Sequence, residues 1–208
     1  MAFYNTISNM SNVQCGFSRN PKMGFGIYAK GYWHSATELA KLLLSRERFY
    51  EYDAYPVIFL YRHSFELYLK NIIYKSAILV STKDPNFLDT ESRKDHRLTY
   101  LSNSAGKILK FLFNQMDGIN LLVENIKVTA EEFDKIDPVS YTYRYPMDNK
   151  SNSVPNQYVN LESVSQHMDL LLNEMEILDF GIDIETDKAI RIMEELENIE
   201  PSEKNQDL

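Results

Sequence analysis

Four side chains that can hold an anion or transfer a proton lie together near the middle of the 208-residue chain. Arg62, Glu66 and Lys70 are each four residues apart, and His63 is adjacent to Arg62. On a helix, this spacing places the three charged side chains within about 80° of one another, with the imidazole beside them. Arginine and lysine attract anions, and an imidazole transfers protons near neutral pH. The spacing therefore predicts a polar cleft along one face of a helix.

The same spacing is also typical of a structural ladder of ion pairs. The surrounding helix is apolar on two sides, as expected for a helix in the centre of a bundle. The two sides are Ile58, Phe65, Leu69 and Ile72, and Leu60, Leu67, Tyr74 and Ile78. Buried charges must pair or line a cavity, so both interpretations stay open. Ser64, Asn71 and Lys75 fall on a third side, which we expect to meet solvent.

Two residues outside this helix could complete a cleft. His96 opens the next helical pattern, and Arg144 lies between Tyr143 and Tyr145. An arginine in a loop flanked by rings can reach into a cleft, or hold a carboxylate such as Glu66 in a bidentate pair.

Other chemistries find less support in the sequence. The single cysteine, Cys15, excludes an intramolecular disulfide and a zinc site built from several cysteines. The four histidines lack the spacing of a zinc site, so neither a metal nor another cofactor is expected. Tyr28, Tyr32 and Trp33 could stack on bases, although such residues more often belong to a core or an interface.

The elements that must position these residues are helices, because apolar residues recur at helical spacing. The main helices are expected over residues 32–49, 56–80, 96–112, 161–178 and 186–196. Thr129 and Glu132 have the spacing of a capping box, which predicts a further short helix that ends at Asp137. Asn160 and Thr186 are expected to cap the last two helices.

Proline and small polar residues mark the segments around these helices. Pro56 is placed where the first turn of the long helix accepts it. Residues 1–30 have no helical period and should form an irregular arm, and residues 199–208 an acidic disordered tail. Residues 138–160 hold three prolines and β-prone residues, which predicts a small β-hairpin or extended insertion. The expected fold is mostly α, with one helical domain over residues 31–198.

The charge of the chain is uneven. The formal net charge is −8, and residues 174–208 hold 12 acids and 3 bases, which gives −9 there and +1 elsewhere. A strongly basic footprint for duplex nucleic acid is thereby excluded over the whole chain, which leaves room for a local basic groove. We see no signal peptide and no uninterrupted apolar stretch of about 20 residues, so a cytoplasmic protein without membrane contact is expected.

Three segments resemble HEPN-like helical proteins, and they follow one another in the expected order. Residues 62–70 have the form Arg-His-x-x-Glu-Leu-x-Leu-Lys, and residues 96–101 the form His-x-Leu-x-x-Leu. Residues 143–146 are similar to an aromatic-Arg-Tyr-Pro segment before the last long helix. The resemblance covers roughly residues 54–180. It implies a helical bundle that often dimerises and that acts in bacterial toxin–antitoxin, abortive-infection or antiviral systems.

Many proteins of this group are RNases, so the resemblance implies a metal-independent RNase site. The catalytic residues would be Arg62, His63 and His96, and Glu66, Lys70 and Arg144 would bind substrate. Such cleavage needs a base for the 2′-hydroxyl and positive charge for the phosphate. In catalytic members of the wider group a histidine follows the arginine after four to six residues, whereas here the two are adjacent.

The alternative is a non-catalytic partner or regulatory subunit, an adaptor or a ligand sensor. Its cleft would then serve structure or anion binding. The expected partners are a second copy of the chain, a protein of a bacterial or phage defence or toxin–antitoxin system, and RNA.

Overall fold

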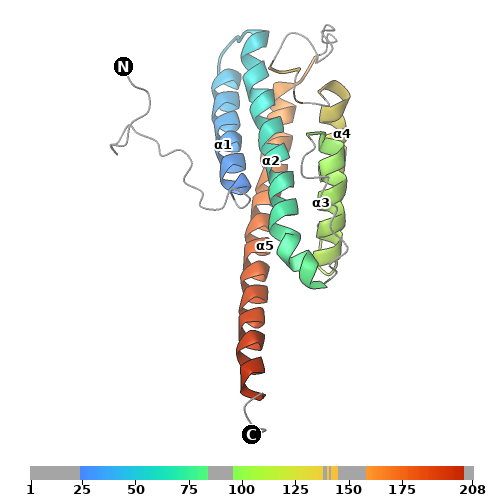
Figure 1. Ribbon diagram of the computed structural model, residues 1–208. Coiled ribbons are helices and arrows are strands. Elements are labelled where there is room, and N and C mark those ends of the chain that lie inside the picture. The colour runs from blue at the N-terminus through green and yellow to red at the C-terminus, as the bar shows by residue number, and fades with distance from the viewer. Residues whose placement is uncertain (1–23, 84–95, 138–139, 141, 145–157, 204–208) are drawn as a thin grey trace, which may run out of the picture.

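The structure, a computed structural model, describes residues 24–83, 96–137, 140, 142–144 and 158–203 (Figure 1). These residues contain five helices and no strand, which confirms the prediction of a mostly α protein. The helices are α1 (Phe25–Leu44), α2 (Glu51–Lys83), α3 (Leu98–Leu112), α4 (Ile119–Ile136) and α5 (Leu161–Glu203).

The central helix of the bundle is α2. It packs against α1, α3 and α5, and α5 also contacts α1. The helices α3 and α4 pack against each other on the far side of α2 from α1 (Figure 1). The last helix, α5, continues well beyond the end of the bundle (Figure 1). This arrangement confirms the central place predicted from the two apolar sides of α2.

Large apolar side chains of α2 fill the space between the helices. Those with no exposed surface include Val57, Tyr61, Phe65, Leu69 and Ile72. The helix α1 meets them with a row of buried small residues, Ala29, Ala36 and Ala40. Small side chains let two helices approach closely. At this contact the Ser64 hydroxyl donates to the backbone oxygen of Ala29 at 2.8 Å.

The start of α1 differs from the prediction. The helix begins at Phe25, whereas the sequence predicted an irregular arm over residues 1–30 and a helix from Tyr32. The prediction is wrong for the end of that arm, and the residues before Gly24 lie outside the described ones. Glycine weakens a helix in isolation. Gly26, however, is buried where α1 touches its neighbours, so the tertiary contact outweighs this local cost.

The helix α2 also begins earlier than predicted. It starts at Glu51, which places Pro56 inside the helix rather than in its first turn. Glu51 and Asp53 are acidic residues in the first turn, where the helix dipole favours negative charge. The N–H of Tyr50 donates to the Asp53 carboxylate at 3.3 Å, as in a helix cap. These local interactions favour a helix that starts at Glu51, whereas the proline alone predicted a start at Pro56.

The second half of the chain forms longer helices than predicted. Thr129 lies inside α4 instead of capping a short helix, and its hydroxyl contacts Nε2 of His167 at 2.7 Å. Thr186 lies inside α5 instead of capping a separate helix, and its hydroxyl donates to the Ile182 carbonyl at 2.8 Å. Both capping predictions are wrong, because the apolar spacing continues through these threonines.

Two predicted boundaries are confirmed. Asp137 directly follows the last residue of α4. The side-chain oxygen of Asn160 accepts a bond from the N–H of Ser163 at 2.9 Å and so caps α5. At the other end, α5 continues through Glu203. The prediction of a disordered tail over residues 199–208 is therefore wrong for residues 199–203, and residues 204–208 lie outside the described ones.

The β-hairpin or extended insertion predicted near 138–160 lies largely outside the described residues. Of that segment, residues 142–144 form a turn. A search of the described helices finds none with the length and apolar character that a bilayer crossing requires.

The close contact at the start of α1 predicts opposite effects for two glycines of that helix. A Cβ at Gly26 would lie 2.9 Å from a carboxylate oxygen of Asp179 and 3.1 Å from Nδ2 of Asn71, whereas one at Gly31 meets nothing within 4 Å. We expect Gly26→Ala to lower the free energy of unfolding by about 1–3 kcal/mol. Gly31→Ala should raise it by about 0.5–1 kcal/mol. Urea unfolding followed by circular dichroism measures both, and equal effects would contradict the packing described.

Candidate functional site

The charged stripe predicted on the long helix forms a ladder of ion pairs. Nη1 of Arg62 lies 3.2 Å from Oε2 of Glu66, and Nζ of Lys70 lies 2.9 Å from Oε1 of Glu66. The three residues are 0%, 2% and 7% exposed. The stripe is therefore buried in the bundle, with the carboxylate between two cations.

Arg62 connects α2 to the ends of two other helices. Its Nε and Nη2 donate to the backbone oxygen of Asp137 at 3.3 and 3.0 Å, and Nη2 also donates to the backbone oxygen of His96 at 3.3 Å. The carboxylates of Asp134 and Asp137 lie within 4.0 and 3.5 Å of the guanidinium. Arg62 thus binds the end of α4 and the start of α3 to the centre of the bundle.

Asp134 has a second role at the same junction. Its carboxylate accepts bonds from the N–H groups of Leu98 and Thr99 at 3.1 and 2.8 Å, and from the Thr99 hydroxyl at 2.7 Å. The first N–H groups of a helix have no acceptor within that helix, so those of α3 need an acceptor from elsewhere. A residue of α4 therefore caps α3, a role that the sequence alone did not predict.

The ladder ends at His96, which is the part of it that solvent can reach. Nδ1 of this imidazole lies 2.8 Å from Oε1 of Glu66 and 3.4 Å from Nζ of Lys70, while the side chain is 64% exposed. Because a carboxylate only accepts, Nδ1 carries the proton in the bond to Glu66. Burial raises the pKa of Glu66, but the bonds and charges of Lys70 and His96 outweigh it and lower that pKa overall.

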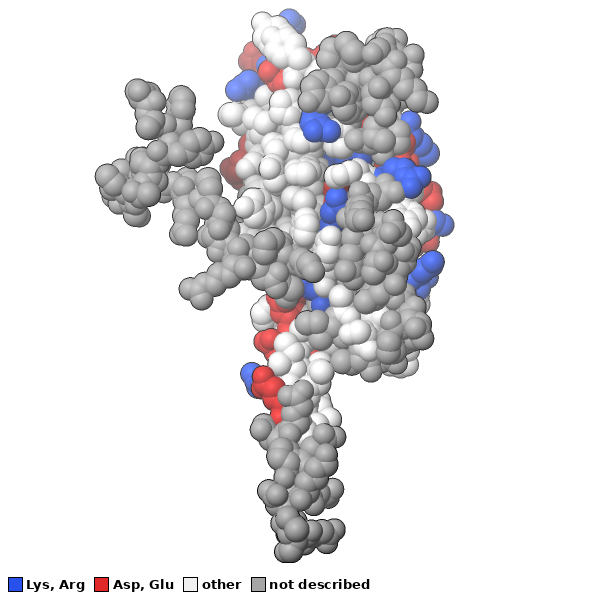
Figure 2. Space-filling model, viewed as in Figure 1, with Lys and Arg blue, Asp and Glu red and all other residues white. Residues whose placement is uncertain are grey.

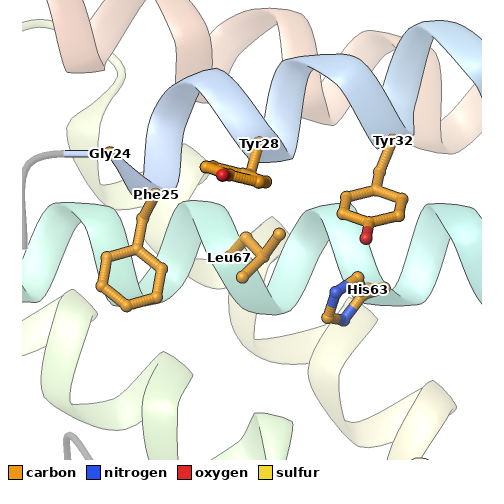
Figure 3. Close-up of a pocket in the computed structure, with 6 residues that line it drawn as sticks. All are labelled: Gly24, Phe25, Tyr28, Tyr32, His63 and Leu67. Atoms are coloured by element: carbon orange, nitrogen blue, oxygen red, sulfur yellow. The ribbon is translucent and has the colours of Figure 1, made fainter. Parts of the chain in front are cut away.

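His63 faces away from the ladder, toward α1. Its ring contacts Tyr32 edge-on, with centroids 4.6 Å apart, and stacks on Phe59 at 5.5 Å. It lines a pocket of about 240 Å³ between α1 and α2. Figure 3 shows rings of α1 facing His63 and Leu67 of α2 across this pocket. The full lining is Gly24, Phe25, Tyr28, Tyr32, His63 and Leu67, and is called the His63 pocket below.

The electrostatic surroundings keep His63 uncharged. Burial lowers the pKa of the imidazole. Glu66 opposes this effect, and the positive charges of Arg62, Arg144 and Lys70 add to it, so that the pKa lies below its ordinary value. A neutral imidazole at neutral pH can donate one hydrogen bond and accept another.

Arg144 lies behind His63, over the ring of Phe59, and is not among the residues that line the His63 pocket. Its Nε donates to the backbone oxygen of Ser140 at 2.6 Å, and its guanidinium lies 5.5 Å from the ring centroid of Phe59. Phe59 in turn stacks on His63. The expected pair between Arg144 and Glu66 is not among the contacts found, since Arg62, Lys70 and His96 bond to that carboxylate.

The third side of α2 is buried, which contradicts the prediction that it meets solvent. Asn71 accepts a bond from the N–H of Gly26 at 3.0 Å and donates to Asp179 at 2.6 Å. Lys75 pairs with Asp179 and Asp183 of α5, each at 2.8 Å. Burial lowers the pKa of Lys75, but these carboxylates outweigh it and raise the pKa overall. The signal missed was the spacing of Asp179 and Asp183, one helical turn apart, which matches a buried lysine.

A further, half-buried carboxylate holds α1 and α2 to α5. Asp169 accepts bonds from Nε1 of Trp33 at 2.7 Å, from the hydroxyl of Thr37 at 2.6 Å and from the hydroxyl of Tyr61 at 2.9 Å. Burial, together with Asp169, raises the pKa of Tyr61. Trp33 is therefore a structural residue, whereas Tyr28 and Tyr32, predicted with it as a base-stacking platform, line the His63 pocket.

Comparison of the chain with protein-family models, with curated proteins and with solved structures found no match in any of the three. Within the described ranges, no group of three or more histidine, cysteine, aspartate or glutamate residues could hold a metal ion.

The burial of Arg62 predicts a large effect on stability. Arg62→Ala removes one of the two buried cations beside Glu66 and breaks the bonds to the backbone oxygens of Asp137 and His96, so we expect the free energy of unfolding to fall by about 3–5 kcal/mol. The matched control is Arg46→Ala at an exposed arginine, which should change it by less than about 0.5 kcal/mol. Urea unfolding measures both variants. Equal stability of the two would show that the ladder does not hold the helices together.

His63 predicts a pH dependence of stability. Because its folded pKa is below the unfolded value of 6.5, its contribution is complete above that value and is lost as the pH falls through the folded pKa. Urea midpoints between about pH 7.5 and 5.5 should therefore fall less in His63→Gln than in the wild type. Parallel curves for the two proteins would contradict a buried, neutral imidazole.

Proposed function

We propose that this protein is a HEPN-like module of a bacterial or phage defence or toxin–antitoxin system. We further propose that it binds RNA and does not cleave it. The three ordered sequence segments and the helical bundle support the first part. The second part rests on one observation, the complete burial of Arg62.

An arginine that neutralises a phosphate during RNA cleavage has to touch that phosphate. Arg62 has no exposed surface, and its donors are directed at Glu66 and at the backbone oxygens of Asp137 and His96. Withdrawing it from these partners would cost several kcal/mol, about what breaking a buried ion pair costs. In this proposal the Arg62–Glu66–Lys70 ladder is scaffold, and ligands bind beside it.

The His63 pocket is the binding place that the surroundings favour. Its volume of about 240 Å³ is below the roughly 300–1,000 Å³ of sites that enclose a whole small molecule. A single planar ring, such as one base of a longer RNA, is the better fit. The rings of Phe25, Tyr28 and Tyr32 offer stacking surfaces, and neutral His63 offers hydrogen bonds. The positive charge of Arg144 acts on His63, which favours a ligand that carries negative charge near the pocket.

A specific observation favours a second candidate function, a metal-independent RNase. The bond from His96 to the buried Glu66 orients an exposed imidazole, as a carboxylate does for a catalytic base. Nζ of Lys70 lies 3.4 Å from Nδ1 of His96, and its positive charge also acts on His63. In this case His96 and His63 would exchange protons with the RNA, and Arg62 would only support them.

One experiment separates the two functions. The purified chain is mixed with a labelled single-stranded RNA in EDTA, and cleavage and fluorescence anisotropy are measured together. We expect the RNA to bind and to stay intact. Tyr32→Ala should weaken binding roughly tenfold or more, because stacking of one base on an aromatic ring contributes about 1–3 kcal/mol.

The control is Tyr50→Ala, which removes a ring that is 68% exposed and is not in the pocket lining. This variant should bind like the wild type. Cleavage that disappears in His96→Ala would establish the second candidate instead. The absence of both binding and cleavage would contradict the binding role of the pocket.

A further inference from the structure

One long seam runs along the side of α5 that faces the bundle. Its positions alternate between spacings of four and three residues, which is the heptad pattern of packed helices. In order, they are Leu161, Ser165, Met168, Leu172, Met175, Asp179, Ile182, Thr186, Ala189, Met193 and Leu196. Up to Thr186 the seam is packed in the bundle, where Ile182 is 0% and Thr186 5% exposed.

The seam continues where the bundle ends. Met193 is 46% and Leu196 59% exposed, and the C-terminal end of α5 projects past the other helices (Figure 1). Ile190 and Ile192 widen the same apolar side and are 38% and 58% exposed. A single helix in water gains little stability by itself, and most of its stability comes from packing an apolar face. The apolar side formed by Ile190, Ile192, Met193 and Leu196, called the α5 face below, therefore lacks the packing that the earlier part of the seam has.

The charge around the α5 face restricts what can cover it. Residues 184–203 contain seven acids and two bases, a net charge of −5. One of the bases, Lys188, already pairs with Glu185 at 2.7 Å. Figure 2 shows acidic side chains beside uncharged ones on this part of the helix. Two copies of the chain joined through this face would bring like charges together, which is unfavourable.

We propose that the α5 face binds an amphipathic helix of another protein, and that this helix carries lysine or arginine beside its apolar stripe. Its apolar residues would pack against Ile190, Met193 and Leu196, and its basic residues would pair with exposed acids beside them, such as Asp187 and Glu195. The proposal rests on the proposed function as a binding module and names the chemical class of its protein partner. Part of the affinity would be electrostatic, so that it falls as salt is raised.

The experiment uses the full chain and two synthetic three-heptad helical peptides. Both have leucine at the core positions, and one has lysine while the other has glutamate at the flanking positions. Fluorescence anisotropy with labelled peptides should show salt-sensitive binding of the lysine peptide alone. Leu196→Lys should weaken that binding roughly tenfold or more, as expected for loss of a central apolar contact.

The matched control is Ile177→Lys. Ile177 is 62% exposed against 59% for Leu196, and it lies on α5 outside the seam. This variant should bind the lysine peptide like the wild type. Equal loss in both variants, equal binding of both peptides, or no binding at all would overturn the proposal.

Sedimentation velocity completes the experiment. A dimer that Leu196→Lys dissociates and Ile177→Lys preserves would overturn the proposal, because the α5 face would then belong to a second copy of the chain. A monomeric protein that binds the lysine peptide through the α5 face would support it. The proposed function fails separately, through RNA cleavage that His96→Ala abolishes while peptide binding is unchanged.

Discussion

The structure depends on satisfying one buried guanidinium. Arg62 has no exposed surface, so every donor it carries has to find an acceptor inside the bundle. The acceptors are a carboxylate one turn further along α2 and two backbone oxygens, at the end of α4 and just before α3. Those helix ends are consequently fixed to the centre of α2. The segments that connect these helices must let both helix ends reach Arg62. This requirement is more specific than apolar packing, because each bond needs one acceptor at one position.

The same constraint separates two residues that are adjacent in the sequence. A step of about 100° around a helix turns Arg62 into the junction and His63 toward α1. One becomes scaffold and the other lines a pocket of aromatic rings. Residues of the scaffold and of the pocket lining can therefore alternate along a single turn.

The sequence was informative where a pattern is local and incomplete where partners come from afar. Spacing alone placed Arg62, Glu66 and Lys70 on one face of a central helix, but it left a buried ladder of ion pairs and a polar cleft as alternatives. The buried contacts of Asn71 and Lys75 did not, because their acceptors lie on α5, more than a hundred positions later. The order of the helices was predicted well. Their ends were not, because a glycine, a proline and two threonines were judged by local preference while tertiary contacts decide there.

Carboxylates on the side of α5 that faces the bundle fix this helix lengthwise. Asp169 and Asp183 bond to α1 and α2 at points 14 residues apart, which is about 21 Å along the helix axis. Sliding α5 by even one turn would break all of these bonds at once. The helix α5 is therefore held in one position along its axis, including the end that projects past the bundle. Any displacement of α5 along its axis would have to carry α1 and α2 with it.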